Sequence, residues 1–562
     1  MKGRADRRIR LLLVILLVAF ATALGRAVWL QALHAAPLAR MAKDQHRQTV
    51  VLPASRGTIY DRTGTPLAVG EQATTVYADP RRIRDARRAA QVAGRVLGIK
   101  PSALLGRLSD RSRGFVYVAR KADPDKAARL AERKLAGFGF YREERRVYPQ
   151  RSVAAQVLGY AGVDNRGLEG VESALDPVLM GRPGSETIVK DPIGRAIDVV
   201  ASTPAHEGRD VYLTLDHNLQ ANAEAVLSQT VSRWHARAAT AVVLDPRSGA
   251  ILAMASAPTY DANRFPEVAS WDRERTTNRA VTDTYEPGST FKVVTISGAL
   301  ADRIVAPGTT FVLPPSIQVA DRVIHDSHER GTEQMSVAEI LWRSSNVGTV
   351  TVAEKLGARR LAAWIDRFGF GHSTGLAFPG ESAGIVLPEA RWSGSTIGNV
   401  PIGQGIAVTG LQMAAAYASV ANKGVWVQPH LVKRIAEGPA LRPKHRRVLP
   451  RKVARTMAHL LVGVVDTEGG TGSLAAVPGY HVAGKTGTAQ KPIPGGYSTS
   501  KYVASFVGFV PATKPRLVIL VTVDEPHDAI WGGVVAAPAF QSIAQFALQY
   551  LEVPPDAPLA AP

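Results

Sequence analysis

The sequence predicts an α+β protein with one apolar N-terminal helix, a mixed α/β module and a larger unit built on an antiparallel sheet covered by helices. Three observations support this prediction. A long stretch over residues 11–33 is apolar apart from Arg26, Gln31 and small residues. Residues 45–205 alternate short apolar runs with Gly, Pro and Arg/Ala-rich helical patches. The remainder has two strand-like runs, a long helical region, three more strand-like runs and a last helix, an order typical of an antiparallel sheet covered by helices.

The composition is that of a globular protein with more than one domain. The chain has 562 residues, of which 46% are hydrophobic and 21% charged, and it is too long for one ordinary core. Its net charge of +20 is compatible with an anionic membrane surface. The basic residues form no zinc finger, RNP motif or basic zipper, so we expect no nucleic-acid partner. The absence of Cys excludes disulfides and thiol nucleophiles, and it suits an exported protein.

The N-terminus predicts a single membrane span. Residues 1–10 carry five Lys and Arg against one Asp, and residues 11–33 are almost wholly apolar. That length can cross about 30 Å of hydrocarbon as a helix, and the positive flank predicts a cytoplasmic tail over 1–10 with export of the rest. The alternative is a signal peptide cleaved after the small residues 21–23. Because the apolar pattern continues to Leu33, we favour an uncleaved anchor.

Residues 45–205 are expected to form a module without catalytic residues. Apolar runs flank Asp61-Arg62-Thr63-Gly64, which predicts a β-hairpin turn. An ion pair between Asp61 and Arg62 within that hairpin is a simpler interpretation of the two charges than acid/base chemistry.

Residues 206–552 are expected to form the catalytic unit. A helix over 219–238 precedes the first two strand runs, and a helix over 537–551 ends the unit. The tail over 553–562 is rich in Pro and Ala and is expected to be disordered. The strand runs are 240–245, 250–256, 480–490, 502–512 and 516–526.

The pattern Ser-x-x-Lys occurs twice, at Ser289 to Lys292 and at Ser498 to Lys501, so the tetrapeptide alone is weak evidence. Ser498 lies in a Gly-rich segment expected to be a loop before a strand. Ser289 follows Pro287-Gly288 and opens an apolar helix. Residues three apart share a helix face, so Lys292 can reach the Ser289 hydroxyl and, with a lowered pKa, can take its proton. A Ser in this place is also a common helix N-cap, and this stretch alone leaves both interpretations open.

Two more motifs occur downstream. Ser344-Ser345-Asn346 offers a hydroxyl that can relay a proton and a carboxamide that can hold an amide, although a serine cluster at a helix start is the simpler interpretation. Lys485-Thr486-Gly487-Thr488 offers a cation and hydroxyls for a carboxylate, and Gly487 would let a ligand backbone approach. The alternative is an ordinary Gly turn with a solvated Lys.

One further cluster suggests metal ligands. His325-Asp326-Ser327-His328-Glu329 combines imidazoles and carboxylates, but it lacks the H-E-x-x-H helical spacing. We therefore expect no metal and no cofactor.

The three motifs in this order form a set known from class A β-lactamases and penicillin-binding proteins. Ser344 lies 55 residues and Lys485 lies 196 residues after Ser289. From about 45 to 550 the chain resembles the class B high-molecular-weight penicillin-binding proteins, which are peptidoglycan transpeptidases. RGTIYDRTGTPLA, RVYP and GLEGVE resemble their dimerisation-type domain, whereas LTLDHNLQ, NRAVTDTYEPGSTFK, FVGFVPA and WGGVVAAPAF resemble their transpeptidase domain. YEPGSTFKVVTISGAL, with HDSHERG before SSN, is more similar to the FtsI-type septal enzymes than to the elongation-type ones.

The resemblance implies a penicillin-binding/serine β-lactamase-like transpeptidase fold over 206–552 and a dimerisation-type (pedestal) domain over 45–205. It implies that Ser289 attacks the D-Ala-D-Ala carbonyl of a peptidoglycan stem peptide to form an acyl-enzyme, which the amine of a second stem resolves. Lys292 would be the base, Ser344 the proton relay and Asn346 a ligand of the substrate amide.

The same resemblance implies how the substrate is held. Lys485, Thr486 and Thr488, beside Gly487, would bind the terminal carboxylate, and the backbone N–H groups of Ser289 and Thr488 would form the oxyanion hole. β-Lactam antibiotics copy the acylating dipeptide and should trap Ser289.

The resemblance also implies a location and partners. We expect a single-pass protein of the bacterial cytoplasmic membrane, with its catalytic domain outside, that works with an FtsW-like glycosyltransferase and other divisome membrane proteins. The alternatives are an elongation-type transpeptidase, a D,D-carboxypeptidase or β-lactamase, and a non-catalytic scaffold or sensor. The intact Ser289 and Lys292 argue against a scaffold, and the anchor with its extra module favours transfer over hydrolysis.

Overall fold

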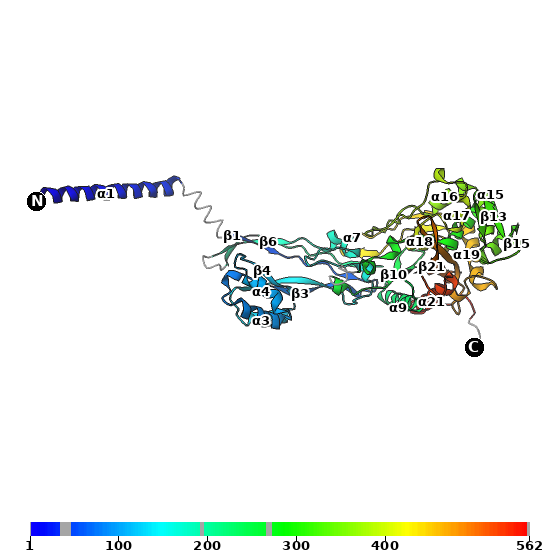
Figure 1. The fold of residues 1–562 in the computed structure, drawn as a ribbon, viewed down its shortest axis with the longest axis horizontal. Helices are drawn as coiled ribbons and strands as arrows, with labels where there is room; N and C mark the ends of the chain where they lie inside the picture. Colours follow the sequence, from blue (N-terminus) through cyan, green and yellow to red (C-terminus); the bar gives the residue numbers. More distant parts are fainter. Residues whose placement is uncertain (1, 34–46, 191–195, 266–271, 559–562) are drawn as a thin grey trace. The chain divides into compact units, whose positions relative to one another are not determined.

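The computed structural model describes residues 2–33, 47–190, 196–265 and 272–558 (Figure 1). The chain divides into two compact units. Residues 1–55 and 181–208 form the first, and residues 56–180 and 209–562 form the second.

The first unit contains the apolar helix and a small sheet. α1 spans Lys2–Val28 and continues as a π-helix, η1, over Trp29–Leu33. The helix therefore includes most of the predicted tail and continues past the alternative cleavage site. Within it, Arg7–Gln31 is long and apolar enough to cross a membrane, and the most apolar part of this segment is not buried inside the protein. An antiparallel sheet in the order β1-β6-β7 is formed by β1 (Arg47–Leu52), β6 (Gly184–Lys190) and β7 (Ala196–Thr203).

The second unit contains a six-stranded sheet that joins residues of both predicted modules. The predicted hairpin is confirmed, because β2 and β3 pair antiparallel and the Asp61 N–H donates to Thr65 O at 2.9 Å. β4 and β5 both pair with β3, whereas β8 runs parallel to β2 and pairs with β18. The strands are β2 (Ile59–Tyr60), β3 (Pro66–Ala78), β4 (Val116–Ala122), β5 (Phe138–Val147), β8 (Val211–Leu213) and β18 (Val432–Ile435).

Three helices pack with β3, β4 and β5 around a small separate core of Ala, Val and Leu side chains. Each begins at a sequence signal: Asp85 caps the first, and Pro stands at the first position of the other two. They are α3 (Ala86–Leu97), α4 (Pro101–Ser109) and α5 (Pro124–Ala131).

The predicted catalytic sheet is present with the predicted strand set. Its five strands lie in the order β10-β9-β22-β21-β20, and every neighbouring pair is antiparallel. In β9 the side chains alternate between two cores, with Ala241 and Val243 in one and Val242 and Leu244 in the other, because successive side chains of a strand point to opposite faces. The strands are β9 (Ala238–Leu244), β10 (Ile251–Ala257), β20 (Ala483–Ile493), β21 (Gly496–Val510) and β22 (Leu517–Asp524).

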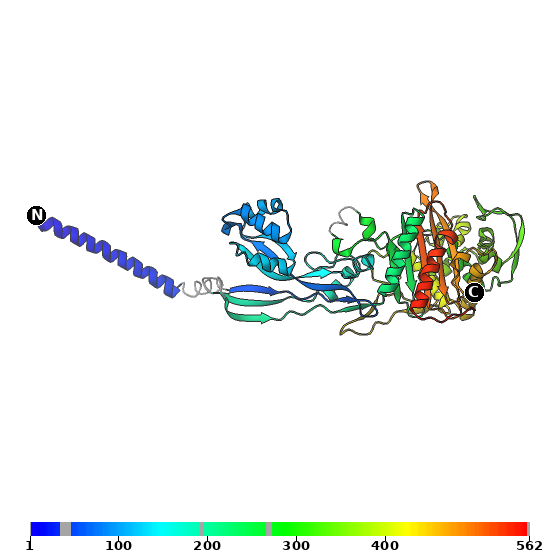
Figure 2. The same ribbon diagram turned by 90° about the horizontal axis from the view of Figure 1, so that it is seen from below.

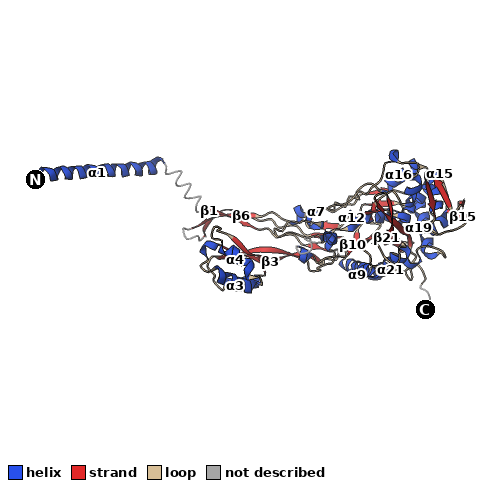
Figure 3. Cartoon of the chain, in the orientation of Figure 1, coloured by secondary structure: helices blue, strands red, loops and turns tan. Residues whose placement is uncertain are grey.

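Helices cover both faces of this sheet. α9 (His217–Arg233) and α21 (Ala537–Tyr550) lie side by side on one face, as Figure 2 shows in green and red. The other face packs against α18 (Gly410–Ala421) and α19 (Arg451–Asp466), two helices of the long region between β10 and β20. Four more helices of that region share the same core and are drawn in blue, like all helices, in Figure 3. They are α13 (Lys292–Ala301), α14 (Val337–Trp342), α15 (Asn346–Leu356) and α16 (Ala358–Phe368).

Short elements complete the second unit. They are η2 (Pro80–Arg82), α6 (Ala155–Leu158), α7 (Gly170–Ala174), α8 (Asp176–Leu179), η3 (Ala262–Arg264), α11 (Arg273–Thr276), α12 (Arg279–Thr282), β11 (Thr284–Tyr285), η4 (Gly288–Phe291), β12 (Thr310–Leu313), β13 (Ser316–Val319), β14 (Arg322–His325), β15 (Glu333–Ser336), η5 (Glu389–Arg391), α17 (Thr396–Asn399), η6 (Val400–Ile402), β16 (Val408–Thr409), β17 (Val425–Val427), β19 (His445–Arg447), η7 (Ser473–Ala475) and α20 (Gly532–Val535).

The C-terminal tail differs from the prediction of disorder over 553–562. The side chain of Val553 is buried, and its carbonyl accepts a hydrogen bond from the Tyr480 hydroxyl. Asp556 accepts hydrogen bonds from the His481 N–H at 2.9 Å and from Thr513. The first residues of this Pro/Ala-rich segment are therefore fixed by hydrogen bonds to segments distant in the sequence, and residues 559–562 lie outside the described part of the chain.

A buried ion cluster joins three of the motifs in residues 56–180, RGTIYDRTGTPLA, RVYP and GLEGVE. Glu172, the last residue of GLEGVE, is fully buried between two arginines. Its Oε2 lies 2.6 Å from Arg56 Nη2, and its Oε1 accepts a hydrogen bond from Arg146 Nε at 2.6 Å. Arg56 also pairs with Asp176 at 2.6 Å. Because buried charges persist only when they are paired, these motifs are required together.

We expect Glu172→Ala to destabilise the second unit by about 3–5 kcal/mol, because it leaves two buried guanidinium groups without their shared carboxylate. The loss can be measured as a fall in the denaturant midpoint of the purified chain. Glu71→Ala is the matched control, because Glu71 pairs with Arg145 on the surface. This substitution should lower the free energy of unfolding by less than about 1 kcal/mol. Equal midpoints for the two variants would contradict the structural role of the cluster.

Candidate active site

Ser289 lies in the 3-10 turn η4, directly before α13. The cap position of that turn is Pro287, and no side chain caps it, so the N-cap interpretation of Ser289 is wrong. The Gly288 N–H donates to Gly403 O at 3.0 Å, and a Cβ on Gly403 would lie only 2.2 Å from Gly288 O. Tyr417 of α18 donates its hydroxyl proton to Thr290 O at 2.9 Å. Backbone packing from two sides therefore fixes the turn that carries Ser289.

Lys292 is fully buried at the start of α13. Its Nζ donates to Ser344 O at 2.6 Å and to Asn346 Oδ1 at 2.8 Å, and it lies 3.3 Å from Ser344 Oγ. Among the hydrogen bonds of the described residues, none joins Lys292 to Ser289, so the predicted direct contact is not made. Burial lowers the pKa of Lys292 to about 7, against the opposing effect of the Asp326 carboxylate. An amine with this pKa can accept a proton near neutral pH.

The Ser344-Ser345-Asn346 motif forms the turn between α14 and α15. Ser344 has φ +58°, a left-handed conformation that is uncommon for a residue with a side chain. Ser345 is the N-cap of α15 and accepts the Gly348 N–H at 2.9 Å. The helix-start interpretation is thus correct for Ser345, while Ser344 and Asn346 contact Lys292. One turn supplies both a cap and polar groups for the site.

Asp326 anchors this turn from a neighbouring loop. Its carboxylate accepts hydrogen bonds from the Asn346 N–H and, at 3.1 Å, from Ser345 Oγ, and it pairs with Arg330 at 2.6 Å. Burial raises the pKa of Asp326, but the hydrogen bonds and Arg330 outweigh burial and hold it below its usual value. Sequence analysis placed Asp326 only in a metal-ligand cluster, and no spacing signal indicated this anchoring contact.

Lys485 of β20 is the second buried lysine. Its Nζ donates to Ser344 Oγ at 2.9 Å and lies 3.2 Å from Thr486 O and from Thr486 Oγ1. Burial first, and the neighbouring Lys292 second, lower its pKa well below the usual range. The alternative of a solvated lysine in a Gly turn is wrong. The structure brings all three motifs together, because Lys292 and Lys485 meet at Ser344.

Gly487 was predicted to let a ligand backbone approach, but the structure shows close contacts with the protein itself. A Cβ there would lie 2.4 Å from Ser505 Oγ and 2.9 Å from Pro287 O. The glycine is therefore required because β20 packs closely against its neighbouring strand and against η4. The close approach is made by the chain itself.

A cavity of about 350 Å³ contains the exposed part of the site. Ser289, Ser344, Asn346, Thr486 and Thr488 line it, whereas Lys292 and Lys485 lie behind its wall. No sequence signal indicated that four other residues line the cavity: His328, which sequence analysis placed only in a metal-ligand cluster, and Gln404, Thr471 and Trp531. The rings of His328 and Trp531 lie 5.4 Å apart.

Comparison with known proteins agrees with this geometry. The family described as "Penicillin binding protein transpeptidase domain" matches residues 239–545, and "Penicillin-binding Protein dimerisation domain" matches residues 51–213. The chain belongs to the penicillin-binding protein transpeptidase family. It is 34% identical to the probable peptidoglycan D,D-transpeptidase PenA of Neisseria gonorrhoeae, over 99% of this chain and 95% of that protein. It is 33% identical to the peptidoglycan D,D-transpeptidase FtsI of Escherichia coli K12, over 98% of this chain and 93% of that protein.

Solved structures of penicillin-binding proteins have the same fold. Penicillin-binding protein 3 of Mycobacterium tuberculosis, complexed with aztreonam, has a TM-score of 0.73 at 32% identity, covering 91% of this chain and 99% of that one. A peptidoglycan synthetase of Bifidobacterium adolescentis has a TM-score of 0.74 at 29% identity, and the match covers 92% of this chain and 98% of that one. The family and fold class that the three motifs indicated are confirmed.

The second Ser-x-x-Lys of this penicillin-binding protein lies apart from the cavity. Ser498 is inside β21, so the predicted loop is wrong. Its Oγ accepts the Lys501 N–H at 3.0 Å, and the Lys501 ammonium pairs with Glu525 at 3.1 Å. Neither residue lines the active-site cavity.

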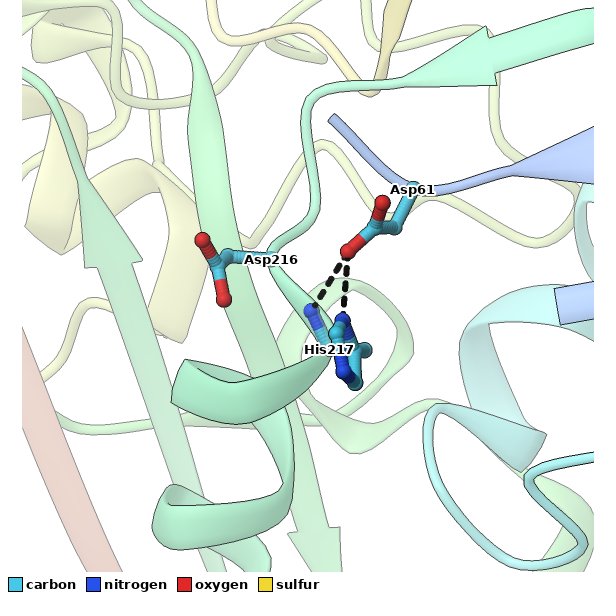
Figure 4. A group of neighbouring side chains, drawn as sticks. All are labelled: Asp61, Asp216 and His217. Carbon is cyan, nitrogen blue, oxygen red and sulfur yellow. Dashed lines mark hydrogen bonds and ion pairs between the residues drawn. The ribbon is translucent and has the colours of Figure 1, made fainter. Parts of the chain in front are cut away.

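One group of described residues has the composition of a metal site. Asp61, Asp216 and His217 offer ligand atoms within 4.8 Å of one another (Figure 4). Asp61 Oδ2 accepts the His217 N–H and lies 2.6 Å from His217 Nδ1, while Asp61 Oδ1 accepts hydrogen bonds from the turn. Asp216 caps α9 and lies 3.7 Å from Arg62. Hydrogen bonds engage both carboxylate oxygens of Asp61 and the Nδ1 of His217, whereas Asp216 Oδ2 has no hydrogen-bond partner among the described residues. The predicted Asp61–Arg62 pair is replaced by Asp61–His217.

We expect Ser289→Ala to abolish labelling of the full chain by a fluorescent penicillin, a loss of at least about 10³-fold in rate, because the cavity then lacks its nucleophile. Ser498→Ala is the matched control and should label like the wild type. Labelling can be followed on membranes by in-gel fluorescence. Persistent labelling of Ser289→Ala, or its loss in Ser498→Ala alone, would contradict the assignment.

Proposed function

We propose that the chain is a serine acyl-transferase that cross-links peptidoglycan stem peptides through an acyl-enzyme on Ser289. Its family and its relatives, which are named peptidoglycan D,D-transpeptidases, support this activity. The observation that carries the proposal is the contact of two buried lysines, Lys292 and Lys485, with one hydroxyl, Ser344 Oγ, in the wall of the cavity that Ser289 lines.

Acylation begins when Ser289 Oγ attacks the carbonyl carbon between the two D-alanines. The Ser289 proton passes to Lys292, whose pKa of about 7 leaves a large neutral fraction at physiological pH. The C–N bond then breaks, and the leaving D-alanine nitrogen takes a proton through Ser344, which contacts both lysines. An ester between Ser289 and the donor stem remains.

The other predicted residues hold the substrate. Asn346 lines the cavity and binds a substrate amide, while its Oδ1 accepts a hydrogen bond from Lys292. Thr486 and Thr488 bind the terminal carboxylate, and Lys485 acts on it from behind Thr486. The backbone N–H groups of Ser289 and Thr488 form the oxyanion hole. Each donor lowers the activation free energy by about 3 kcal/mol. Gly487 serves this site by letting β20 lie against the turn of Ser289.

Resolution of the ester by an amine is favoured over hydrolysis. In class A β-lactamases a Glu side chain activates the water that removes the acyl group, and the cavity-lining residues of the described chain include no carboxylate. The amine of a second stem attacks the ester carbonyl instead, forms the cross-link and returns a proton to Ser289 Oγ. The same acylation step makes Ser289 the target of β-lactam antibiotics.

The proposal extends to location and partners. The apolar helix within 11–33 spans the cytoplasmic membrane once, with 1–10 inside and the catalytic unit outside, as its length and basic flank support. Residues 45–205 form a pedestal domain before a transpeptidase domain over 206–552. The similarity to FtsI supports a septal role beside an FtsW-like glycosyltransferase and other divisome membrane proteins, rather than an elongation role.

The proposed transfer predicts a distinct product. Incubated with a peptidoglycan polymerase and lipid-linked precursor, the full chain should form cross-linked stem-peptide dimers and release one D-alanine per link. Ser289→Ala should form none, because no acyl-enzyme forms. Digestion of the polymer and mass spectrometry of the fragments measure both products. Trimmed stems without dimers would contradict transfer and indicate a carboxypeptidase.

A further inference from the structure

A groove of about 510 Å³ lies between α3 and the loop that follows α5. Its apolar lining is half-buried and consists of Val92 and Val96 of α3 and Leu135 of the loop, which pack against the small core of this helical region. Exposed basic side chains line the groove on both sides. They are Arg84, Arg88 and Arg95 on the side of α3 and Arg133 and Lys134 on the side of the loop.

The basic side chains of this groove have no acidic partner. None of the five forms an ion pair within the described part of the chain, and Asp79, the acid shortly before them, pairs with Arg81 instead. Among the described lining residues the one acid is Asp85, which caps α3 by accepting the Arg88 N–H at 2.9 Å. Five exposed cations against one carboxylate leave an excess of positive charge that an anionic partner complements.

The spread of these charges favours an extended partner over a single small anion. Arg88 and Arg95 are seven residues apart, which is about 10 Å along a helix, and Arg133 and Lys134 line the groove from the loop. One phosphate or carboxylate cannot contact all of them. A flat membrane surface would contact the exposed cations without entering the groove, so the apolar lining would stay uncovered. An amphipathic helix with acids on both flanks of an apolar stripe satisfies both sets of side chains.

We propose that this groove is the docking site for an acidic amphipathic helix of a partner protein. The apolar stripe of that helix would pack against Val92, Val96 and Leu135, and its Asp or Glu side chains would pair with the basic residues on both sides. Arginine suits this role because its guanidinium can hold a carboxylate with two parallel hydrogen bonds. The groove shares no lining residue with the cavity of Ser289, so the inference does not depend on the proposed function.

A synthetic helix can serve as the probe. It is a fluorescein-labelled, hydrocarbon-stapled peptide of about 15 residues with Leu along one face and Glu on both flanks. One analogue has Gln in place of Glu, and a second has the same residues reordered so that no apolar face forms. Binding to the full chain in phosphatidylcholine nanodiscs can be measured by fluorescence anisotropy, with empty nanodiscs as the background.

We expect a dissociation constant of roughly 10 μM for the acidic amphipathic helix. It should bind at least about tenfold more tightly than the Gln analogue, which lacks the ion pairs, and than the reordered analogue, which lacks the apolar contact. Equal binding of the reordered acidic peptide would indicate charge attraction alone and would overturn the proposal. The absence of saturable binding would also overturn it.

Matched pairs of substitutions locate the probe. Arg88→Gln with Arg133→Gln removes one cation from each side of the groove and should weaken the acidic helix by about tenfold. Arg87→Gln with Arg129→Gln removes the same charge from exposed positions of α3 and α5 that do not line the groove, and it should change the affinity by less than about threefold. Equal weakening by the two pairs, or unchanged affinity in the first pair, would contradict docking in the groove.

Two further measurements complete the test. If thermal denaturation shows that the first pair is unfolded, Arg95→Gln with Lys134→Gln replaces it with the same expected loss, since these two residues also line the groove from both sides. Vesicles of phosphatidylglycerol and phosphatidylcholine probe the membrane as the other occupant. Vesicle binding that depends on the groove arginines, without binding of the acidic helix, would assign the groove to lipid and overturn the proposal.

Discussion

The active site depends on two lysine side chains buried against one serine hydroxyl. Removing an ammonium group from water costs several kcal/mol, so a fold can keep two such groups together only by supplying hydrogen-bond partners and by lowering their pKa values. Here the partners of Lys292 and Lys485 include Ser344, and burial lowers the pKa of both amines. In the proposed mechanism, the neutral amine of Lys292 is the base that takes the proton of the Ser289 nucleophile.

The rest of the catalytic unit holds this arrangement in place. The three motifs come from separate elements: η4 with α13, the turn before α15, and β20. Glycines let these elements approach backbone to backbone, since side chains at Gly403 or Gly487 would collide with the turn of Ser289 or with β21. Asp326 fixes the middle motif through the Asn346 N–H and Ser345. The geometry of the site thus follows from packing between elements rather than from any single helix or strand.

Local sequence signals predicted the elements and the site residues, but not the contacts among them. The apolar span, the strand set and the hairpin at Asp61 follow from periodicity and turn residues, which act over short distances. The expectation that Lys292 contacts Ser289 relied on helical spacing. In the structure the Lys292 amine donates its hydrogen bonds to Ser344 and Asn346, more than fifty residues away in the sequence. Burial of Lys485, the close packing at Gly487 and the anchoring role of Asp326 all depend on long-range packing that spacing does not encode.

The pH dependence of acylation by a penicillin tests the neutral lysine most directly. If neutral Lys292 takes the proton of Ser289, the second-order rate constant should rise about tenfold per pH unit below about 7 and become level above it. Lys292→Arg, which keeps its charge at every accessible pH, should remain inactive throughout. A rate that is flat from pH 5 to 9, or that keeps rising toward the pKa of an ordinary lysine near 10.5, would contradict the account.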